Sequence, residues 1–314
     1  MDTLQVPSPL REVRRVMVSG AGGGFDVFAG LPLAAALRNA GKEVVLANLS
    51  FTDLGATDGA RLAPAVVTVR PDTDGPGEYF PGRHLAAWMQ LQGWEPEVYA
   101  FEKVGVAPLR EAWRALIAHH RCDAVVLVDG GTDILMRGDE AGLGTPEEDM
   151  ASLAAVAGLD VPCRLVCCVG FGIDAHHGVC HAHFLENVAA LARAGGYLGA
   201  QALVPAMPEV QAYLDAVAFA EARSKERESI VNASLASAVE GHFGDYHRTR
   251  RTQGGVLFIN PLMSFLWAFQ LDAVARRSLY LSSLEGTQSI WDVAARIEAF
   301  RNATPCRPYT SIPH

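Results

Sequence analysis

Lysine is nearly absent from this sequence: Lys42, Lys103 and Lys225 are the only three in 314 residues. Acidic residues outnumber basic ones, and the formal net charge is −9 with a pI of about 5.6. This charge argues against nucleic acids and anionic membrane surfaces as the main partners. Because nearly all positive charge is arginine, we expect any side chain that binds an anionic ligand to be an arginine, which favours bidentate contacts.

The sequence also lacks a segment that could cross a membrane or direct secretion. The longest apolar run, residues 256–271, is interrupted by Asn260-Pro261, and residues 1–15 are polar without an apolar core. The six cysteines show no paired Cys-x-x-Cys spacing, and three of them lie in or beside a predicted buried strand. We therefore expect a soluble, cytoplasmic protein whose cysteines are reduced.

Three well-known site motifs are missing as well. No Gly-Lys-Ser/Thr follows the N-terminal glycines, so the turn is not a P-loop. Phe25 stands where a dinucleotide-binding Gly-x-Gly-x-x-Gly needs its third glycine, and the second predicted strand ends in Asn48 in place of an acid. No Gly-x-Ser-x-Gly elbow is present. NAD binding is therefore disfavoured, whereas a divalent cation is compatible with the acidic turns described below.

Predicted strands and helices alternate along the chain, which is typical of a parallel sheet with helices on both faces. We expect a three-layer α/β/α, Rossmann-like fold with a mostly parallel sheet, formed by residues 1–314 as one domain. Residues 71–95 are predicted to be a long loop, and the helical segment 207–243 is predicted to cover the sheet. Predicted strands span residues 13–19, 44–48, 65–70, 124–128, 164–169 and 256–259, and predicted helices span 31–39, 106–119, 181–193, 291–300 and a stretch that starts at 146. Residues 208–240 are predicted to be almost wholly helical, either as one long helix or as a helical hairpin.

The segment Thr145-Pro146-Glu147-Glu148 matches the start of a helix. A threonine followed three residues later by a glutamate forms a capping box, and proline at the first helical position has no N–H to leave unsatisfied. We therefore predict a purely structural role for these residues.

The chain's most distinctive stretch is Gly20-Ala21-Gly22-Gly23-Gly24-Phe25-Asp26, directly after the first predicted strand. So many glycines favour a turn with φ > 0 or backbone N–H groups that a ligand approaches closely, and such a turn suits an anion. The alternative is a plain glycine turn in which Asp26 only caps a helix. The predicted ligand-binding residues here are Gly22, Gly23, Gly24, Asp26 and, at the end of the second strand, Asn48.

A second acidic turn, Asp129-Gly130-Gly131-Thr132-Asp133, follows a short and wholly apolar strand. Carboxylates at the end of such a strand can hold ribose hydroxyls, a divalent cation or a proton in acid–base catalysis. The alternative is a tight turn that uses Asp and Gly for local backbone bonding. We predict ligand binding by Asp129, Gly130, Gly131 and Thr132, and catalysis by Asp133 and by Glu140 of the nearby Arg-Gly-Asp-Glu.

The third turn, Gly172-Ile173-Asp174-Ala175-His176-His177-Gly178, adds histidines to a carboxylate. We predict that Asp174 and His176 form an acid–base pair and that His177 contacts the ligand. The six residues from Ile173 to Gly178 also resemble a segment of arginase- and deacetylase-type metal hydrolases. That resemblance implies an alternative site in which Asp174, His176 and His181 bind a metal, although no upstream His-His dyad completes it.

The three turns together resemble a known but uncharacterised family. Gly-Ala-Gly-Gly-Gly-Phe-Asp, then Asp-Gly-Gly-Thr-Asp with Arg-Gly-Asp-Glu, then Gly-Ile-Asp occur in the order found in the domain of unknown function 1152 family of archaea and bacteria. The resemblance runs over most of the chain and implies no established activity. The cluster His176-His177 and His181-x-His183 departs from that family's usual pattern.

The strand that enters Asp129-Gly130-Gly131-Thr132 is also similar to the Pro-Gly-Gly-x-Gly-Thr-x-x-Glu segment of nucleotide phosphoribohydrolases. In those enzymes the glycine turn faces the phosphate and the acid acts at the ribose. This sequence lacks the proline and the Gly-Thr pair, so the similarity suggests a substrate class by analogy alone.

These observations favour a metabolic or biosynthetic enzyme that acts on a phosphorylated or nucleoside-like small molecule by hydrolysis or group transfer. The alternatives are a metal-dependent amidohydrolase that uses Asp174 and His176, and a small-molecule binding protein without turnover. The cationic loop 242–251 fits a solvated loop better than an anion clamp over the site. We expect no nucleic-acid or membrane partner, and a homo-oligomer is compatible with the sequence.

Overall fold

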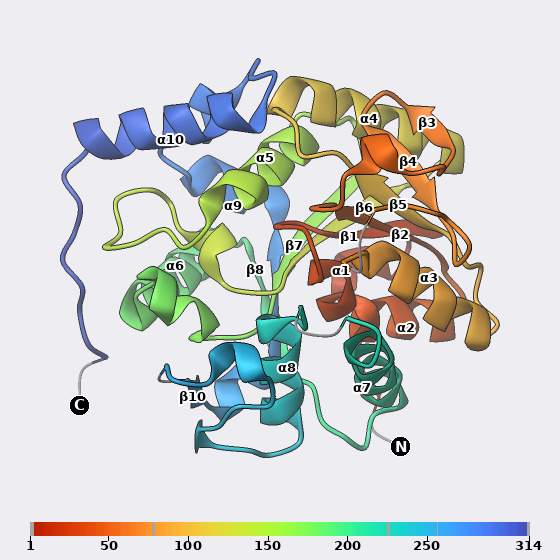
Figure 1. Ribbon diagram of the computed structural model, residues 1–314. Coiled ribbons are helices and arrows are strands. Elements are labelled where there is room, and N and C mark those ends of the chain that lie inside the picture. The colour runs from red at the N-terminus through yellow and green to blue at the C-terminus, as the bar shows by residue number, and fades with distance from the viewer. Residues whose placement is uncertain (1–2, 77–78, 225–226, 256, 313–314) are drawn as a thin grey trace.

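A nine-stranded sheet runs through the middle of the computed structural model, which describes residues 3–76, 79–224, 227–255 and 257–312 (Figure 1). The strand order across the sheet is β3-β4-β5-β2-β1-β6-β7-β11-β8. Its strands are β1 (Arg15–Gly20), β2 (Glu43–Leu49), β3 (Arg61–Ala63), β4 (Val66–Val69), β5 (Val98–Phe101), β6 (Ala124–Asp129), β7 (Cys163–Cys168), β8 (Tyr197–Ala202) and β11 (Phe265–Gln270). A separate antiparallel pair consists of β9 (Gly244–Asp245) and β10 (Phe258–Ile259).

The five central strands β5, β2, β1, β6 and β7 are all parallel, and the antiparallel strand pairs lie toward the two edges. From β1 the chain first builds β2 and β5 on one side and later builds β6 and β7 on the other side. The strand order therefore reverses between β1 and β6. In open α/β sheets, ligands bind beyond the carboxyl ends of the strands at such a point.

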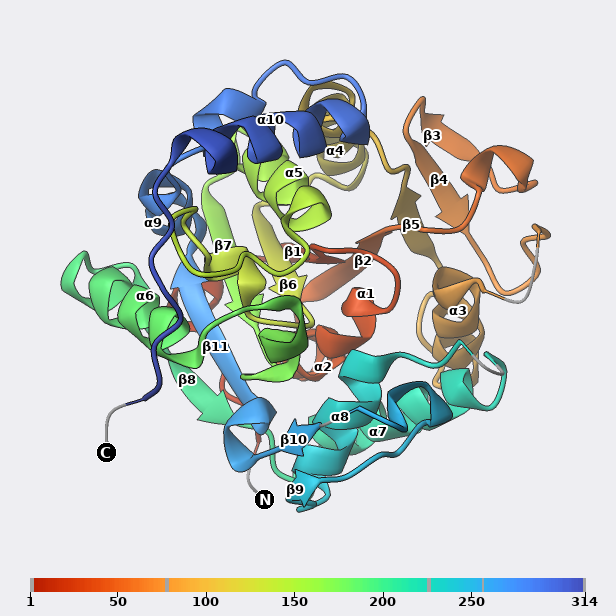
Figure 2. The same ribbon diagram turned by 60° about the vertical axis from the view of Figure 1, so that its left-hand side comes forward.

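Helices cover both faces of the sheet, which confirms the predicted three-layer α/β/α fold (Figure 2). One hydrophobic cluster joins the sheet to α4 (Val106–His120), α5 (Pro146–Ala157), α6 (His181–Arg193), α9 (Leu271–Arg277) and α10 (Ile290–Ala303). The other joins it to α1 (Asp26–Ala29), α2 (Leu31–Asn39), α3 (Pro81–Leu91), α7 (Pro208–Glu221) and α8 (Ile230–Val239).

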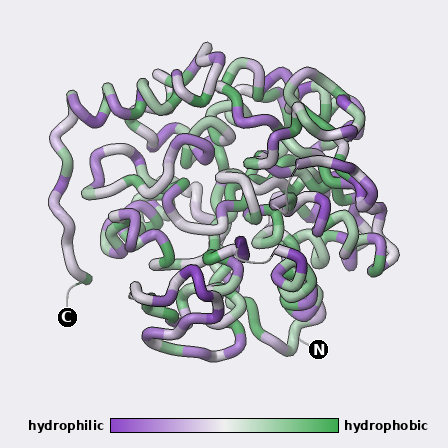
Figure 3. The backbone as a smooth tube through the Cα atoms, viewed as in Figure 1, coloured by the Kyte–Doolittle hydropathy of each residue, from purple (hydrophilic) through white to green (hydrophobic). Residues whose placement is uncertain are grey.

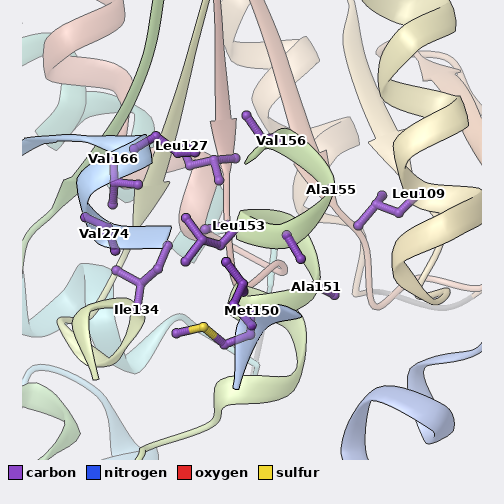
Figure 4. Packing of buried hydrophobic residues seen from close by; sticks show 14 of the residues in the cluster. Leu109, Leu127, Ile134, Met150, Ala151, Leu153, Ala155, Val156, Val166 and Val274 are labelled. Atoms are coloured by element: carbon purple, nitrogen blue, oxygen red, sulfur yellow. The ribbon is translucent and has the colours of Figure 1, made fainter. Parts of the chain in front are cut away.

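Successive residues of the central strands enter opposite clusters. Met17 and Leu127 belong to the first cluster, whereas Val18 and Val126 belong to the second. Figure 3 shows hydrophobic residues (green) along these strands, and Figure 4 shows Leu127 of β6 packed near Leu153 of α5. Because both faces are covered, the strands are mostly apolar and show no regular alternation of apolar and polar residues.

Several predicted elements agree closely with the structure. The predicted helices 31–39 and 181–193 have the same bounds as α2 and α6. Gly30 is the N-cap residue of α2, and Gly41 adopts φ +76° just beyond its end, as the stop signal required.

The prediction of a loop over residues 71–95 was wrong, because Pro81–Leu91 forms α3. Proline and glycine at its start suggested a loop, but Pro81 occupies the first turn, where its missing N–H costs nothing. Leu85, Trp88 and Met89 have the spacing of one helix face and are buried.

The strand predicted over residues 256–259 is confirmed only in part. Phe258 and Ile259 form β10, which pairs with β9 outside the main sheet, and Val256 lies outside the described residues. Lys225, in the charged middle of the predicted helical segment, also lies outside them. The strands that were missed are β3, β5, β8, β9 and β11, and β11 runs antiparallel between β7 and β8.

The segment 207–243 forms a hairpin of two helices, and α7 packs against α2 and α3, which themselves flank the sheet. Two buried hydrogen bonds connect the helices of the hairpin to the rest of the protein. Tyr213 Oη of α7 donates to Asn232 Oδ1 of α8 at 3.1 Å, and Asn232 Nδ2 donates to the Phe25 carbonyl at 3.1 Å. These bonds tie the hairpin to the glycine turn that follows β1.

Tyr213→Phe should lower the free energy of unfolding by about 1–2 kcal/mol, because it removes a buried hydrogen bond and leaves the Asn232 side-chain oxygen without its donor. Urea unfolding measures the change. Tyr309→Phe, at an exposed tyrosine, is the control and should change little. Equal stability of the two variants would show that the Tyr213 hydroxyl does not anchor the hairpin.

Candidate functional site

A cavity of about 410 Å³ lies where the turns after β1, β6 and β7 meet. The cavity lies at the carboxyl ends of β1, β6 and β7. Figure 2 shows these strands side by side, where the strand order reverses between β1 and β6. The far wall comes from the start of α8 and from the loop that holds Arg251. Its lining contains most of the predicted site residues: Gly22, Gly23, Gly24, Asp26, Asp129, Gly130, Gly131, Asp133, Asp174, His176 and His177.

The glycine turn after β1 does not offer its N–H groups to a ligand. The Gly22 amide donates to Asp26 Oδ2 at 2.9 Å, and the Gly24 amide donates to the Leu49 carbonyl at 3.0 Å. The Gly22, Gly23 and Gly130 amides all stabilise the ionised Asp26 side chain, and this contribution lowers its pKa against the larger opposite effect of burial. The predicted anion cradle is therefore filled by the protein's own carboxylate.

The glycines of this turn serve close packing instead. Gly23 and Gly24 adopt φ +96° and +61°, which side chains rarely tolerate. A Cβ atom at Gly24 would lie 2.6 Å from the Tyr79 hydroxyl oxygen. Asn48, predicted to bind a ligand, is buried outside the cavity lining and donates from Nδ2 to the Gly24 carbonyl at 2.6 Å, so it shapes the turn.

The turn after β6 also directs its amides to carboxylates. Asp129 accepts from the Gly131 amide at 2.7 Å and from the Ile134 amide at 3.2 Å. Thr132, which does not line the cavity, donates from its amide to Asp174 Oδ2 at 2.7 Å and thereby joins the second and third turns. The acidic side chains are thus held in fixed orientations by backbone donors.

Thr145, predicted to cap a helix, has a different partner. Helix α5 does begin at Pro146, but no side-chain cap bond forms. The Thr145 amide donates to Asp133 Oδ2 at 2.8 Å, and its hydroxyl donates to the same oxygen at 3.4 Å. The predicted helix start is confirmed, but the predicted capping bond is absent, and Thr145 and Glu148 line the cavity.

Asp149 is a site residue that sequence reasoning missed. It lies in the first turn of α5, lines the cavity and is 2% exposed. Its Oδ1 atom has no hydrogen-bond partner among the described residues. The adjacent pair Glu148-Asp149 at a helix start was the available signal, but acids are common there because they complement the helix dipole.

Five aspartates share this small space, and their pKa values rise together. Burial is the largest cause for each, and repulsion from the neighbouring carboxylates adds to it for Asp26, Asp129, Asp149 and Asp174. The pKa of Asp26 rises to about 7, those of Asp129, Asp149 and Asp174 rise well above the ordinary value, and that of Asp133 also rises. Such a cluster is stable only if it holds protons or binds a cation.

Asp174 and His176 both line the cavity but do not form the predicted hydrogen-bonded pair. Asp174 accepts from Thr132, whereas His176 Nδ1 lies 2.7 Å from the Ile173 carbonyl. A carbonyl can only accept, so Nδ1 carries a proton, and Nε2 is the ring nitrogen that can act as a base. The His177 ring lies 3.8 Å from that of His176, and burial lowers the pKa of His177.

Besides Asn48 and Thr132, two further predicted residues lie away from the cavity lining. Glu140 is fully buried and accepts from the Arg137 and Gly138 amides at 3.0 and 2.8 Å, so it holds its own loop together. His181 packs edge-on against Phe171 with ring centres 5.1 Å apart. Asp174, His176 and His181 therefore do not form the alternative metal site.

A different acidic group has the spacing for a metal ion. Among the described residues, Asp26, Asp129 and Asp149 each place one carboxylate oxygen within 4.8 Å of the others. Unlike the predicted set, this group draws on the turn after β1, the end of β6 and the first turn of α5.

The more exposed part of the cavity lining, which we call the rim, has another character. Arg251 lines the cavity and donates from Nη1 to the Glu228 carbonyl, so one residue of the loop expected to be solvated faces the site. Phe51 and Tyr79 add aromatic surface, and Phe51 is 48% exposed. The cavity thus combines an acidic floor with a rim that carries a cation and two aromatic rings.

Comparisons with known proteins identify a family without giving an activity. Searches of curated proteins and of solved structures found no match to this chain. No helix among the described residues has the length and apolar character to span a bilayer. The family model described as "Protein of unknown function (DUF1152)" matches residues 65–305, a range that includes the second and third turns and begins after the glycine turn. That match covers well over half of the sequence, so the chain belongs to the DUF1152 family, as its motifs predicted.

Proposed function

We propose that this protein is an enzyme that acts on a phosphorylated or nucleoside-like small molecule by hydrolysis or group transfer. The observation that carries the proposal is the meeting of Asp174, His176 and Arg251 at one cavity on the ligand-binding edge of an α/β sheet. The volume of about 410 Å³ suits a small metabolite.

The proposed chemistry uses Asp174 as the proton donor and His176 as the proton acceptor. Burial raises the pKa of Asp174, so its carboxyl group keeps a proton that it can donate to a leaving oxygen. His176 Nε2 accepts the proton of the attacking water or hydroxyl. The bond to the leaving oxygen breaks as the bond to the attacking oxygen forms, and the two proton transfers balance.

The rim supports the choice of substrate. Arg251 can pair with a phosphate through charge-assisted hydrogen bonds. Phe51 and Tyr79 provide aromatic surface against which a base or sugar ring can pack. A phosphorylated nucleoside or sugar presents both chemical features in one molecule.

The direct test is turnover of a panel of nucleotides, nucleosides and sugar phosphates, followed by mass spectrometry of the products. Conversion of a panel member supports the proposal. A compound that raises the melting temperature but is recovered unchanged would instead assign a binding protein without turnover.

Arg251→Ala should raise KM for the substrate by about 10–100-fold and leave kcat nearly unchanged, because a hydrogen bond to a charged group contributes roughly 1.5–3 kcal/mol. Arg250→Ala is the matched control, since Arg250 is the exposed neighbour outside the cavity lining. Equal KM values for the two variants would remove Arg251 from substrate binding.

A further inference from the structure

We propose that Asp26, Asp129 and Asp149 bind one divalent cation of the magnesium and manganese class at the floor of the cavity. One oxygen from each carboxylate lies within 4.8 Å of the other two, a spacing that a single ion with ligand distances of about 2.0–2.4 Å can bridge. The binding claim goes beyond the proposed function, because it holds with or without turnover.

The unsatisfied side chain of Asp149 points independently to a ligand. Its Oδ1 is buried without a hydrogen-bond partner, and its carboxylate lies beside those of Asp26 and Asp129. No ion pair within the described residues involves any of the three aspartates, although Lys103 pairs with neighbouring Glu148. A buried carboxylate without a partner is costly, and a bound cation removes that cost.

Backbone donors hold the other two ligands in place. The Gly22 amide binds Asp26 Oδ2, and the Gly131 and Ile134 amides bind the two oxygens of Asp129. Each carboxylate oxygen has a further lone pair for a metal. Such outer contacts orient ligands and strengthen metal binding.

The glycines leave room for the three carboxylates to approach one another. A Cβ atom at Gly22 would lie 2.8 Å from Asp26 Oδ2 and 2.9 Å from Asp149 Oδ1. A Cβ atom at Gly130 would lie 2.7 Å from Asp26 Oδ1. The glycines that the sequence suggested for anion binding thus make space for an anionic protein site.

The ligand chemistry selects the kind of ion. Three carboxylates supply only oxygen atoms and three negative charges, which suits a hard cation such as Mg²⁺ or Mn²⁺ better than Zn²⁺. Three protein ligands leave coordination positions open. If the proposed function holds, those positions would let an anionic phosphate approach the acidic floor.

The test is Mn²⁺ binding to the full chain, measured by titration calorimetry and by the loss of the free Mn²⁺ paramagnetic resonance signal. We expect one Mn²⁺ per chain in the wild type. Asp149→Asn should weaken binding at least about 100-fold, because even changes to outer-shell partners cost 10–100-fold. Glu147→Gln, on the same turn of α5 outside the cavity lining, should bind as the wild type does.

A second measurement and a second variant distinguish the loss of a metal ligand from misfolding of the chain. In EDTA, Asp149→Asn should melt at or above the wild-type temperature, because it removes an unpaired buried carboxylate. Gly22→Ala should weaken Mn²⁺ binding with all three aspartates intact. Absence of stoichiometric binding by the wild type, or unchanged binding by both variants, would overturn the proposal. The titrations need no substrate, so an inactive panel assay leaves their result unaffected.

Discussion

Asp174→Asn should lower kcat for the substrate by about 10²–10⁴-fold and leave KM within about threefold, the range expected when a general acid is lost. The asparagine oxygen can still accept the Thr132 amide that now binds Asp174 Oδ2 at 2.7 Å. The turn after β6 should therefore keep its shape, while the side chain can no longer transfer a proton. Steady-state kinetics on the substrate found in the panel measure the change.

Asp160→Asn is the control for this prediction. Asp160 is an exposed carboxylate just before β7, so it lies at the opposite end of that strand from Asp174. Its variant should keep wild-type kcat, and both variants should keep the wild-type circular dichroism spectrum. A kcat of Asp174→Asn within tenfold of wild type would reduce Asp174 to a residue that positions Thr132.

Much of the fold was predictable because its central strands carry strong local signals. The run Ala124–Asp129 is apolar at every position before its final acid, as a strand covered on both faces requires. The start of α2 is marked by Gly30 and Pro32, and its end by Gly41. Two of the missed strands carry weaker local signals: β5 has only four residues, and β8 contains Gly199 at φ +113°.

The sequence also indicated which turns meet, but not what their donors bind. Parallel strands bring the residues after β1, β6 and β7 to one edge, so Gly23, Asp133 and Asp174 line the same cavity. The direction of a backbone N–H group depends on the tertiary structure. Only the structure shows that the Gly22 amide faces Asp26, and that Asp149 enters the site from a helix start that reads as structural.

The metal-free protein should become less stable as pH rises from about 5 to about 7, opposite to the usual loss of stability in acid. Burial and the neighbouring acid Asp133 raise the folded-state pKa of Asp26 from 3.8 to about 7, so in this interval the folded form binds more protons than the unfolded chain. The stabilisation that comes from the Asp26 proton is fully present below pH 3.8, falls between pH 3.8 and about 7, and is lost above about pH 7. Ion-paired acids such as Asp139, whose pKa is lowered, lose their contribution only at lower pH.

We expect the melting temperature in EDTA to fall by roughly 5–10 °C between pH 5 and pH 7.5, given the several kcal/mol at stake for a chain of this length. Asp26→Asn should flatten this profile, because it removes the proton that the folded state retains. Excess Mg²⁺ should also flatten it, since the cation stabilises the ionised cluster where protons are lost. A metal-free melting temperature that rises steadily over the same interval would show that the buried aspartates are already ionised at pH 5. Their charges would then have to be balanced by a group other than the proton.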